Sequence, residues 1–495
     1  MRGIRDIIRG AGYHSKVLLI IGVIIAFPAS VIIFYPGEAR YMSSFLVPGG
    51  FIVAFGLALA LVTQRETVRE GHVFQSPIRK GSLSVLFAWC CAILAGSVPF
   101  VFGGQLDFVH ALFESVSGWT TTGLTVSDIP NMPHIFLFHR AFIQYCGGLG
   151  FIVVIAVVLH GKQLTSMYAA EGHPDGIMPS IRRTAIVIIS IYMSCLVVGT
   201  ILYSVFGMRV FESICHTMSA LSTAGFSTRA ESILEYGSLP IEIVTIFLML
   251  IGCSNFAVLT LVLRGKIKRV LKISEVRFML WVIALFVLLM MIPMILNADM
   301  GFFKSLRESA FCVVTMFTTT GYSISDYAVW PPFAMMLIML LMALGGGTGS
   351  SAGGIKMLRA YIVVRFTKEN MHRRMSPNHN VRVMHYMRPN GEAPIDNNLI
   401  RDTFEFVTVY FGILVVGTLL ITLFEGCSLS AAAYEFTSAF GTVGVSNGLT
   451  ARASTPTLFV EMAGMLMGRL EIFILFIGLH TLFLKAKDFF AGQVD

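Results

Sequence analysis

The sequence predicts an all-α polytopic membrane protein with about ten transmembrane helices. Of the 495 residues, 55% are hydrophobic and only 13% are charged, whereas an ordinary soluble protein has about 25% charged residues. A soluble chain of this length could not cover its surface with so few polar groups, so soluble, secreted, disordered and fibrous classes are excluded. The net charge of +8 does not indicate a nucleic-acid partner, because Lys and Arg lie in the gaps between apolar runs.

A helix of roughly 20 apolar residues crosses a bilayer core about 30 Å thick. Runs of about this length occur at 17–35, 46–64, 82–103, 134–160, 183–206, 240–263, 276–297, 331–358, 404–424 and 456–484. Every second gap between runs is rich in Lys and Arg, as cytoplasmic loops are. We therefore expect both termini to face the cytoplasm and the first run to be an uncleaved span.

A motif of the form Thr-x-Gly-apolar-Ser/Thr occurs four times, each time between successive long runs. The copies begin at Thr121, Thr223, Thr319 and Thr442. A single copy would be read as an ordinary turn, but chance gives roughly one match in ten chains of this size, so four copies form an internal repeat. Short apolar or amphipathic segments, too short to span, precede the copies at 108–119, 211–221, 307–317 and 429–440. We expect four units, each made of a span, a half-helix, a glycine-containing loop and a span.

Four such loops in one chain can surround one axis, where their carbonyl oxygens would replace the hydration shell of a cation. The negative C-terminal ends of the half-helices would favour a cation over an anion. A glycine is expected in each loop because a filter carbonyl often requires a positive φ. The predicted filter consists of Thr121, Thr122, Gly123 and Leu124; Thr223, Ala224, Gly225 and Phe226; Thr319, Thr320, Gly321 and Tyr322; and Thr442, Val443, Gly444 and Val445.

The eighth run is interrupted by the glycine-rich stretch 345–354, followed by Ile355 and Lys356. Part of it fits a dinucleotide-binding fingerprint, but the βαβ context is missing. Two interpretations stay open, a flexible kink of packed small residues and a helix broken into a loop beneath the filter.

Two cations lie within or beside the apolar runs. Arg469 is near the middle of the tenth run, where a charge costs about 2.5–3.5 kcal/mol on insertion scales, so it should face a partner or a wet cavity. An ion pair with Glu471 or Glu461 is one alternative. Lys356 could extend to the cytoplasmic interface. We interpret His216 as a core or interface histidine.

These motifs together resemble the Trk/Ktr/HKT superfamily of potassium transporters. The extra pair of spans before the first repeat makes the chain look like the Trk membrane subunit of the TrkH/TrkG type. The resemblance implies a homodimer in the bacterial cell inner membrane, with a potassium filter in each chain and K⁺ bound at the filter residues. In plant relatives a serine at the first filter glycine goes with sodium transport, so Gly123 favours potassium. The fourth motif departs most from the others, which makes cation passage a firmer expectation than strict selectivity.

The resemblance also implies a gate and a regulatory partner. The gate residues are Gly345, Gly346, Gly347, Gly349, Gly353, Gly354, Lys356 and Arg469. The implied partner is a cytoplasmic ring of the TrkA type that binds NAD and adenine nucleotides. The hydrophilic stretch 366–396 is either its docking loop or simply a solvated loop.

We expect an N-terminal two-helix unit over 1–80 and pore repeats over 81–165, 166–270, 271–396 and 397–495, the third with the gate and the cytoplasmic loop. The expected function is gated potassium uptake, with no cofactor in this chain other than the transported ion and no enzymatic activity. A sodium- or proton-coupled, or a less selective, monovalent cation transporter is the alternative. A membrane-embedded enzyme would need converging catalytic groups, and a secondary transporter with a twofold repeat would show two related halves.

Overall fold

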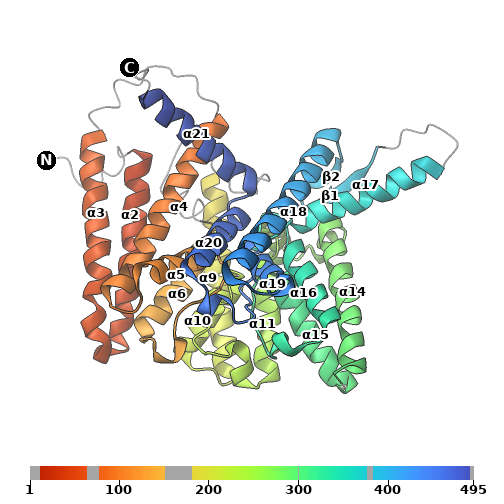
Figure 1. Ribbon diagram of the computed structural model, residues 1–495, viewed down its shortest axis with the longest axis horizontal. Coiled ribbons are helices and arrows are strands. Elements are labelled where there is room, and N and C mark those ends of the chain that lie inside the picture. The colour runs from red at the N-terminus through yellow and green to blue at the C-terminus, as the bar shows by residue number, and fades with distance from the viewer. Residues whose placement is uncertain (1–11, 64–76, 151–180, 299, 376–382, 491–495) are drawn as a thin grey trace.

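The computed structural model describes residues 12–63, 77–150, 181–298, 300–375 and 383–490. This part of the chain is almost entirely helical (Figure 1). Its one sheet is an antiparallel hairpin of β1 (His385–Arg388) and β2 (Gly391–Pro394). The predicted all-α class is therefore confirmed.

The N-terminal helices pack together on one side of the molecule (Figure 1). They are α2 (Tyr13–Ala26), continued by η1 (Phe27–Ile33), then η2 (Pro36–Tyr41), α3 (Ser43–Thr63) and α4 (Pro77–Phe102). Helices α2 and α3 cross closely at Gly22 and Gly49. A Cβ placed on Gly22 would lie only 2.8 Å from the carbonyl oxygen of Gly49, so the crossing requires a residue without a side chain. Small residues allow such close crossing of apolar helices in membranes.

The rest of the described chain repeats one pattern, in which a long helix is followed by a short helix, a loop and a second helix. After α4 come α5 (Phe108–Trp119), η3 (Ile129–Asn131) and α6 (His134–Gly148). The next elements are α9 (Ile181–Val205), α10 (Val210–Leu221), η4 (Ser232–Tyr236), α11 (Leu239–Gly252), α12 (Phe256–Leu263) and α13 (Ile267–Val270). Then follow α14 (Ser274–Leu296), α15 (Phe302–Phe317), η5 (Tyr327–Val329), α16 (Pro332–Leu344) and α17 (Met357–Met375). The last are α18 (Asn397–Glu425), α19 (Leu429–Phe440), η6 (Thr450–Arg452), α20 (Thr455–Arg469) and α21 (Ile472–Phe490).

Among the described residues, six helices are long and apolar enough to cross a membrane, or up to eight if each bent pair counts as one span. In the second and fourth repeats the second helix is bent. Helices α11 and α12 meet at 115°, and α20 and α21 meet at 109°. The apolar run 331–358 breaks at its glycine-rich stretch, and residues 151–160 of the run 134–160 lie outside the described residues. The count of ten spans stays a prediction, as do the domain boundaries and the orientation.

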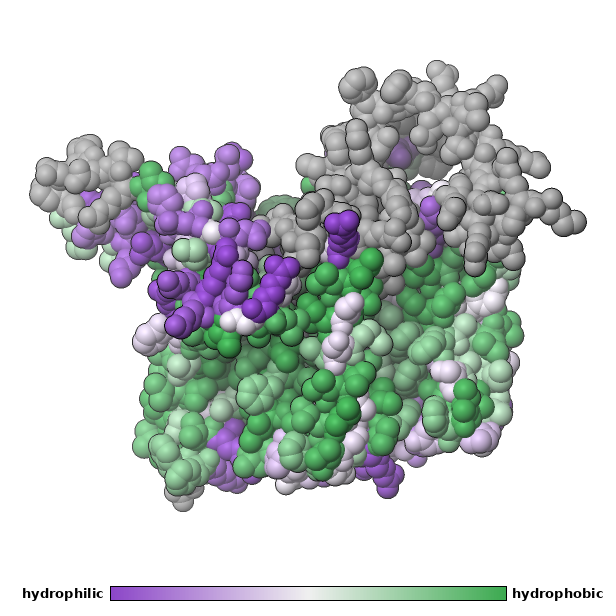
Figure 2. All heavy atoms as spheres, turned by 180° about the vertical axis from the view of Figure 1, so that it is seen from behind, coloured by the Kyte–Doolittle hydropathy of each residue, from purple (hydrophilic) through white to green (hydrophobic). Residues whose placement is uncertain are grey.

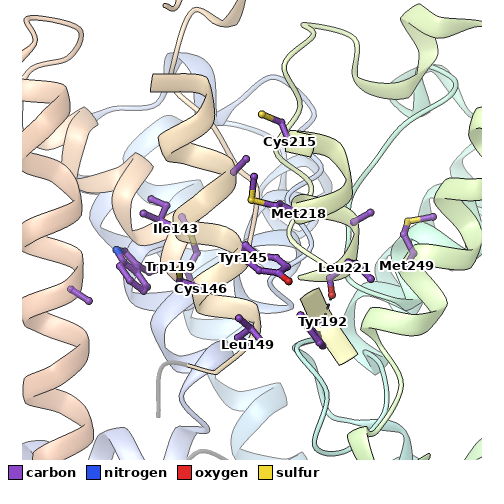
Figure 3. Packing of buried hydrophobic residues seen from close by; sticks show 14 of the residues in the cluster. Trp119, Ile143, Tyr145, Cys146, Leu149, Tyr192, Cys215, Met218, Leu221 and Met249 are labelled. Carbon is purple, nitrogen blue, oxygen red and sulfur yellow. Dashed lines mark hydrogen bonds between the residues drawn. The ribbon is translucent and has the colours of Figure 1, made fainter. Parts of the chain in front are cut away.

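The core between the first two repeats is built from large apolar side chains (Figure 3). Trp119, at the end of α5, lies beside Ile143 and Cys146 of α6. The rings of Tyr145 and Tyr192 are 5.9 Å apart between centroids. Gly147 permits the crossing of α5 and α6, because a Cβ at this position would collide with the Trp119 carbonyl. The C-terminal end of α5 therefore lies directly against α6.

The face seen in Figure 2 carries a broad apolar band, with hydrophilic residues gathered above it over the α17 end of the molecule. The last turn of α17 contains His372, Arg373 and Arg374. The stretch 366–396 is therefore not only a loop, because it contains the end of α17 and the β1–β2 hairpin. Its residues 376–382 lie outside the described part.

Candidate functional site

Four short helices end in the same way, and each leads into one of the predicted glycine loops. We call these loop 1 (121–124), loop 2 (223–226), loop 3 (319–322) and loop 4 (442–445). In each, a loop N–H donates to the carbonyl five residues earlier, over 2.9 Å for Thr122 to Ser117, 3.0 Å for Ala224 to Ser219, 2.9 Å for Thr320 to Thr315 and 2.9 Å for Val443 to Ser438. These bonds satisfy carbonyls that a helix end otherwise leaves without a partner.

The first threonine of every loop has an unusual backbone conformation. The φ angles of Thr121, Thr223, Thr319 and Thr442 are 55°, 53°, 56° and 52°. A β-branched residue at positive φ is a genuine outlier, and such strain of about 1–3 kcal/mol persists only where the surroundings impose it. The sequence predicted positive φ for the four loop glycines, and this is confirmed at 98°, 80°, 76° and 89° for Gly123, Gly225, Gly321 and Gly444. The positive φ of the threonines, which were themselves predicted filter residues, was not predicted.

The four loops contact one another in a closed order. A Cβ placed on the glycine of any loop would lie far closer than 3.0 Å to a carbonyl oxygen of the next loop. The pairs are Gly123 with Ala224, Gly225 with Thr320, Gly321 with Val443, and Gly444 with Thr122. Loop 4 thus returns to loop 1. A side chain at any of these glycines would displace a carbonyl of its neighbour.

A buried ion pair that the sequence analysis missed holds the backbone after loop 1. Glu114 of α5 accepts hydrogen bonds from Thr125 Oγ1 at 2.5 Å and from Val126 N at 2.8 Å. Arg140 of α6 donates to the same carboxylate through Nε at 3.0 Å, and both side chains are almost fully buried. The Arg140 guanidinium also lies 3.8 Å from the centroid of the Phe226 ring. The pair therefore ties loop 1 to loop 2, and loss of one partner would leave an unpaired buried charge.

In the second and fourth repeats, the residue at the position equivalent to Glu114 supports the backbone after the loop. Glu435 of α19 accepts a hydrogen bond from Ser446 Oγ, and His216 Nε2 lies 3.1 Å from Ser227 Oγ. Glu114, His216 and Glu435 each stand nine residues before a loop glycine. This constant spacing is the signal that could have revealed them. His216 is a buried core histidine, as predicted, and it also positions loop 2.

One glutamine of α6 fixes loop 2. Gln144 is fully buried, and its Nε2 donates to the Ala224 carbonyl at 2.8 Å. Its Oε1 accepts from Ser219 Oγ at 2.9 Å and from Phe226 N at 3.3 Å. The Ala224 carbonyl, which the sequence predicted to be an ion ligand, thus has a protein donor in this structure.

The glycine-rich stretch 345–354 forms a loop that reaches the threonines of loops 1 and 2. Ser351 Oγ lies 2.9 Å from Thr223 Oγ1 and donates to the Gly252 carbonyl at 3.1 Å. Thr121 Oγ1 donates to the Ser351 carbonyl at 3.4 Å. Both threonines are fully buried. Ser351, which was not among the predicted gate residues, is therefore the residue that joins this stretch to loops 1 and 2.

The same stretch contacts the threonines of loops 3 and 4 through Gly353. Its N–H donates to Thr319 Oγ1 at 3.1 Å. A Cβ on Gly353 would collide with Thr442 Oγ1, so only glycine allows this approach. The 345–354 loop therefore lies against the first threonine of all four loops, on one side of their ring.

Hydrogen bonds at both ends hold the 345–354 loop in this place. At its base, Ile355 N donates to the Ala343 carbonyl at 3.0 Å, which closes the chain on itself. At its far side, Asn255 Nδ2 donates to the Thr348 carbonyl at 2.6 Å, and Thr348 N donates to Glu275 Oε1 at 2.6 Å. Of the two interpretations left open by the sequence, the structure has the broken helix and not the flexible kink.

The two predicted gate cations occupy different positions. Lys356 is buried, and its Nζ donates back to the Ala352 carbonyl, so it does not extend to the interface. Arg469 ends α20, and its Nη2 donates to the Gly147 carbonyl of α6 at 2.6 Å. Glu471 forms an ion pair with Arg359 at 2.7 Å.

The described residues contain no group of three or more His, Cys, Asp or Glu side chains that could hold a metal ion. The contacts between the loops are formed by the backbone carbonyls of Thr122, Ala224, Thr320 and Val443. Potassium filters are built from rings of such carbonyl oxygens.

Comparison with known proteins gives the family. The family model described as "TrkH: Cation transport protein" matches residues 51–482. The Trk system potassium uptake protein TrkG of Escherichia coli (strain K12) is 30% identical over 417 residues, which cover 80% of this chain and 83% of that protein. The Trk system potassium uptake protein TrkH of Halomonas elongata is 26% identical over 441 residues, covering 86% and 89%.

A solved structure agrees with these sequence matches. The crystal structure of the potassium transporter TrkH from Vibrio parahaemolyticus matches with a TM-score of 0.80 at 26% identity, over 94% of this chain and 98% of that one. The match to the TrkH family model covers far more than half of the sequence. The chain therefore belongs to the TrkH family of cation transport proteins.

Proposed function

We propose that this chain takes up potassium ions across a bacterial inner membrane and that loops 1 to 4 form its selectivity filter. The observation that carries the proposal is the closed order of contacts among four loops with identical helix caps. Four helix C-termini end at these loops, so their partial negative charges favour a cation. Relatives named as potassium uptake proteins support potassium as the ion.

The filter residues in this proposal are those that the sequence predicted. Threonine, carbonyl and glycine positions repeat in all four loops, and the glycines keep side chains out of the ring. Ion flow would follow the electrochemical gradient, which supplies about 2.3 kcal/mol per charge per 100 mV. A less selective monovalent cation transporter is the second candidate, because loop 4 has Val443 where loop 1 has Thr122.

The proposal also assigns the gate to the 345–354 loop together with Lys356 and Arg469. The loop lies against the four threonines, where it would obstruct an ion leaving the filter. Opening requires these hydrogen bonds to break. A cytoplasmic nucleotide-binding subunit of the TrkA type would shift this equilibrium, and the hydrophilic end of α17 with the β1–β2 hairpin is the surface we assign to its docking. We also propose that the chain works as a homodimer.

Rubidium uptake into proteoliposomes tests the proposal. Purified wild-type chain and a variant with a shortened 345–354 loop are compared with empty liposomes at the same potassium gradient. We expect measurable uptake with the wild type and faster uptake with the variant, both inhibited by potassium more strongly than by sodium. Equal uptake in all three preparations would contradict the proposed function, and equal inhibition by both ions would favour the less selective transporter.

A further inference from the structure

Loop 4 is supported by a different pair of side chains from loop 1. In the first repeat, Arg140 lies seventeen residues after Gly123 and forms an ion pair with Glu114. In the fourth repeat, the residue seventeen positions after Gly444 is Glu461. The chain thus places a second carboxyl group where the first repeat has the guanidinium.

The two carboxyl groups of the fourth repeat share one hydroxyl. Glu435 and Glu461 are both 0% exposed. Thr450 Oγ1 lies 2.5 Å from Glu435 Oε1 and 3.2 Å from both carboxyl oxygens of Glu461. Thr450 N also donates to Glu435 Oε1 at 3.0 Å. With Ser446 and Asn447, Glu435 accepts four hydrogen bonds.

The Thr450 hydroxyl contacts two carboxyl groups but can donate a hydrogen to only one of them. A threonine hydroxyl carries a single hydrogen, and the short distance assigns that hydrogen to Glu435. The contact between Thr450 and Glu461 is then favourable only if Glu461 itself donates. An ionised carboxylate has no hydrogen to donate, whereas a protonated carboxyl group has one.

Charge leads to the same answer. The ionisable groups of the described residues that act on Glu461 are Glu435 of α19 and Glu425 at the end of α18. Both are carboxyl groups, and Arg452, the nearby cation, acts on Glu425. Glu425 is only partly buried and accepts hydrogen bonds from Ser454. Two buried carboxylates that share a site cannot both ionise cheaply, so one of them keeps its proton.

We propose that Glu461 is a neutral carboxyl group that holds a proton and, through Thr450 and Glu435, fixes loop 4 in place. The hydrogen bonds run from Glu461 to Thr450 and from Thr450 to Glu435, whose carboxylate supports the backbone after loop 4. Loss of the proton would set two buried negative charges against each other and release this support. The ligand that the pair Glu435 and Glu461 binds is thus a proton. The consequence for ion flow rests on the proposed function.

The direction of the pH dependence follows. The neutral form of Glu461 prevails at low pH, so the support of loop 4 is complete there and is lost as the pH rises. Above the pKa of a single titrating group, its protonated fraction falls about tenfold per pH unit. Potassium-selective flux should fall with it.

Infrared spectroscopy tests the proton directly and needs no transport. The purified wild-type chain should show the carbonyl stretch of a protonated carboxyl group at neutral pH. Glu461→Gln keeps a donor for Thr450 but cannot ionise, and it should lose that band. The matched control Glu425→Gln, at the same end of the repeat, should retain it. Absence of the band in the wild type, or its persistence in Glu461→Gln, would overturn the proposal even if the chain transports no ion.

Rubidium uptake tests the consequence, with the pH raised equally on both sides of the liposome. We expect flux to fall in the wild type and in Glu425→Gln as the pH rises, by up to about tenfold per pH unit. In Glu461→Gln we expect flux that stays constant within about twofold over the same range. A wild-type pH profile in a folded Glu461→Gln chain would refute the link between this proton and loop 4.

Discussion

Replacement of Gly123 by serine tests whether loops 1 to 4 form one functional ring. Gly123 has a φ of 98°, and a Cβ there would collide with the Ala224 carbonyl of loop 2. To restore an ordinary contact of 3.4 Å, that carbonyl must recede by about 1 Å. The shift would also stretch its hydrogen bond from Gln144.

The expected magnitude follows from the strain. A side chain in a disfavoured backbone conformation costs about 1–3 kcal/mol, and the weakened hydrogen bond adds about 1 kcal/mol. Since selectivity depends on the number and field of the ligands, this strain appears as altered ion binding. We expect the preference for potassium over sodium to fall about 30- to 700-fold, as the combined cost of about 2–4 kcal/mol implies at 1.4 kcal/mol per tenfold change.

The assay uses cells that lack their own potassium uptake. Growth on limiting potassium and the inhibition of rubidium entry by sodium are measured for each variant. The matched control is Gly118→Ser, at a helical position where the atoms nearest to the added Cβ are side-chain atoms, two of Ile143 within 3.0 Å and one of Phe226 at an ordinary 3.6 Å. Its packing cost should lower the amount of protein without changing selectivity. Wild-type discrimination in Gly123→Ser, or an equal loss in both variants, would show that the loops are not the filter.

The remaining predictions concern the gate and its regulation. Arg469→Ala removes the guanidinium that joins α20 to the Gly147 carbonyl, and it should raise basal rubidium flux; unchanged or lower flux in folded protein would count against a gating role. Ser351→Ala removes the hydroxyl that contacts Thr223 and Gly252. At about 1 kcal/mol for a hydrogen bond, the fraction of molecules with an open gate should rise about fivefold. A flux equal to that of the wild type would argue that the Ser351 hydroxyl does not hold the gate closed. The isolated chain should bind neither ATP nor NAD, because the glycine-rich stretch forms a loop between two helices; saturable binding by calorimetry would disprove this.

The short helices were the best predicted part of the fold. The expected segments 108–119 and 429–440 coincide with α5 and α19. Their starts are marked by the capping side chains of Asp107 and Ser428, and their ends by the motif that follows. Both signals are local, so a single sequence contains them.

Changes in the direction of a helix axis, and contacts between residues far apart in the sequence, were not predictable in this way. The tenth run is apolar on both sides of the bend between α20 and α21, which lies at Arg469–Glu471, where Glu471 has a φ of 60°. Hydropathy measures composition and carries no information on direction. The pairing of Glu114 with Arg140 requires knowledge of how α5 crosses α6. The β1–β2 hairpin was different, because Pro389 and Asn390, followed by Gly391, are turn-forming residues present in the sequence and they were not interpreted as a hairpin turn.

The closed order of the four loops has a consequence for genetics. A pore made from four identical subunits repeats every substitution four times, whereas here each loop is encoded once. One, two, three or four loops can therefore carry the same alteration in a single polypeptide, without mixtures of subunits. The graded series would show whether each loop contributes an equal increment to ion discrimination. Loop 4 already differs from loop 1 at Val443, so the four quarters of the ring are chemically unequal even before any substitution is made.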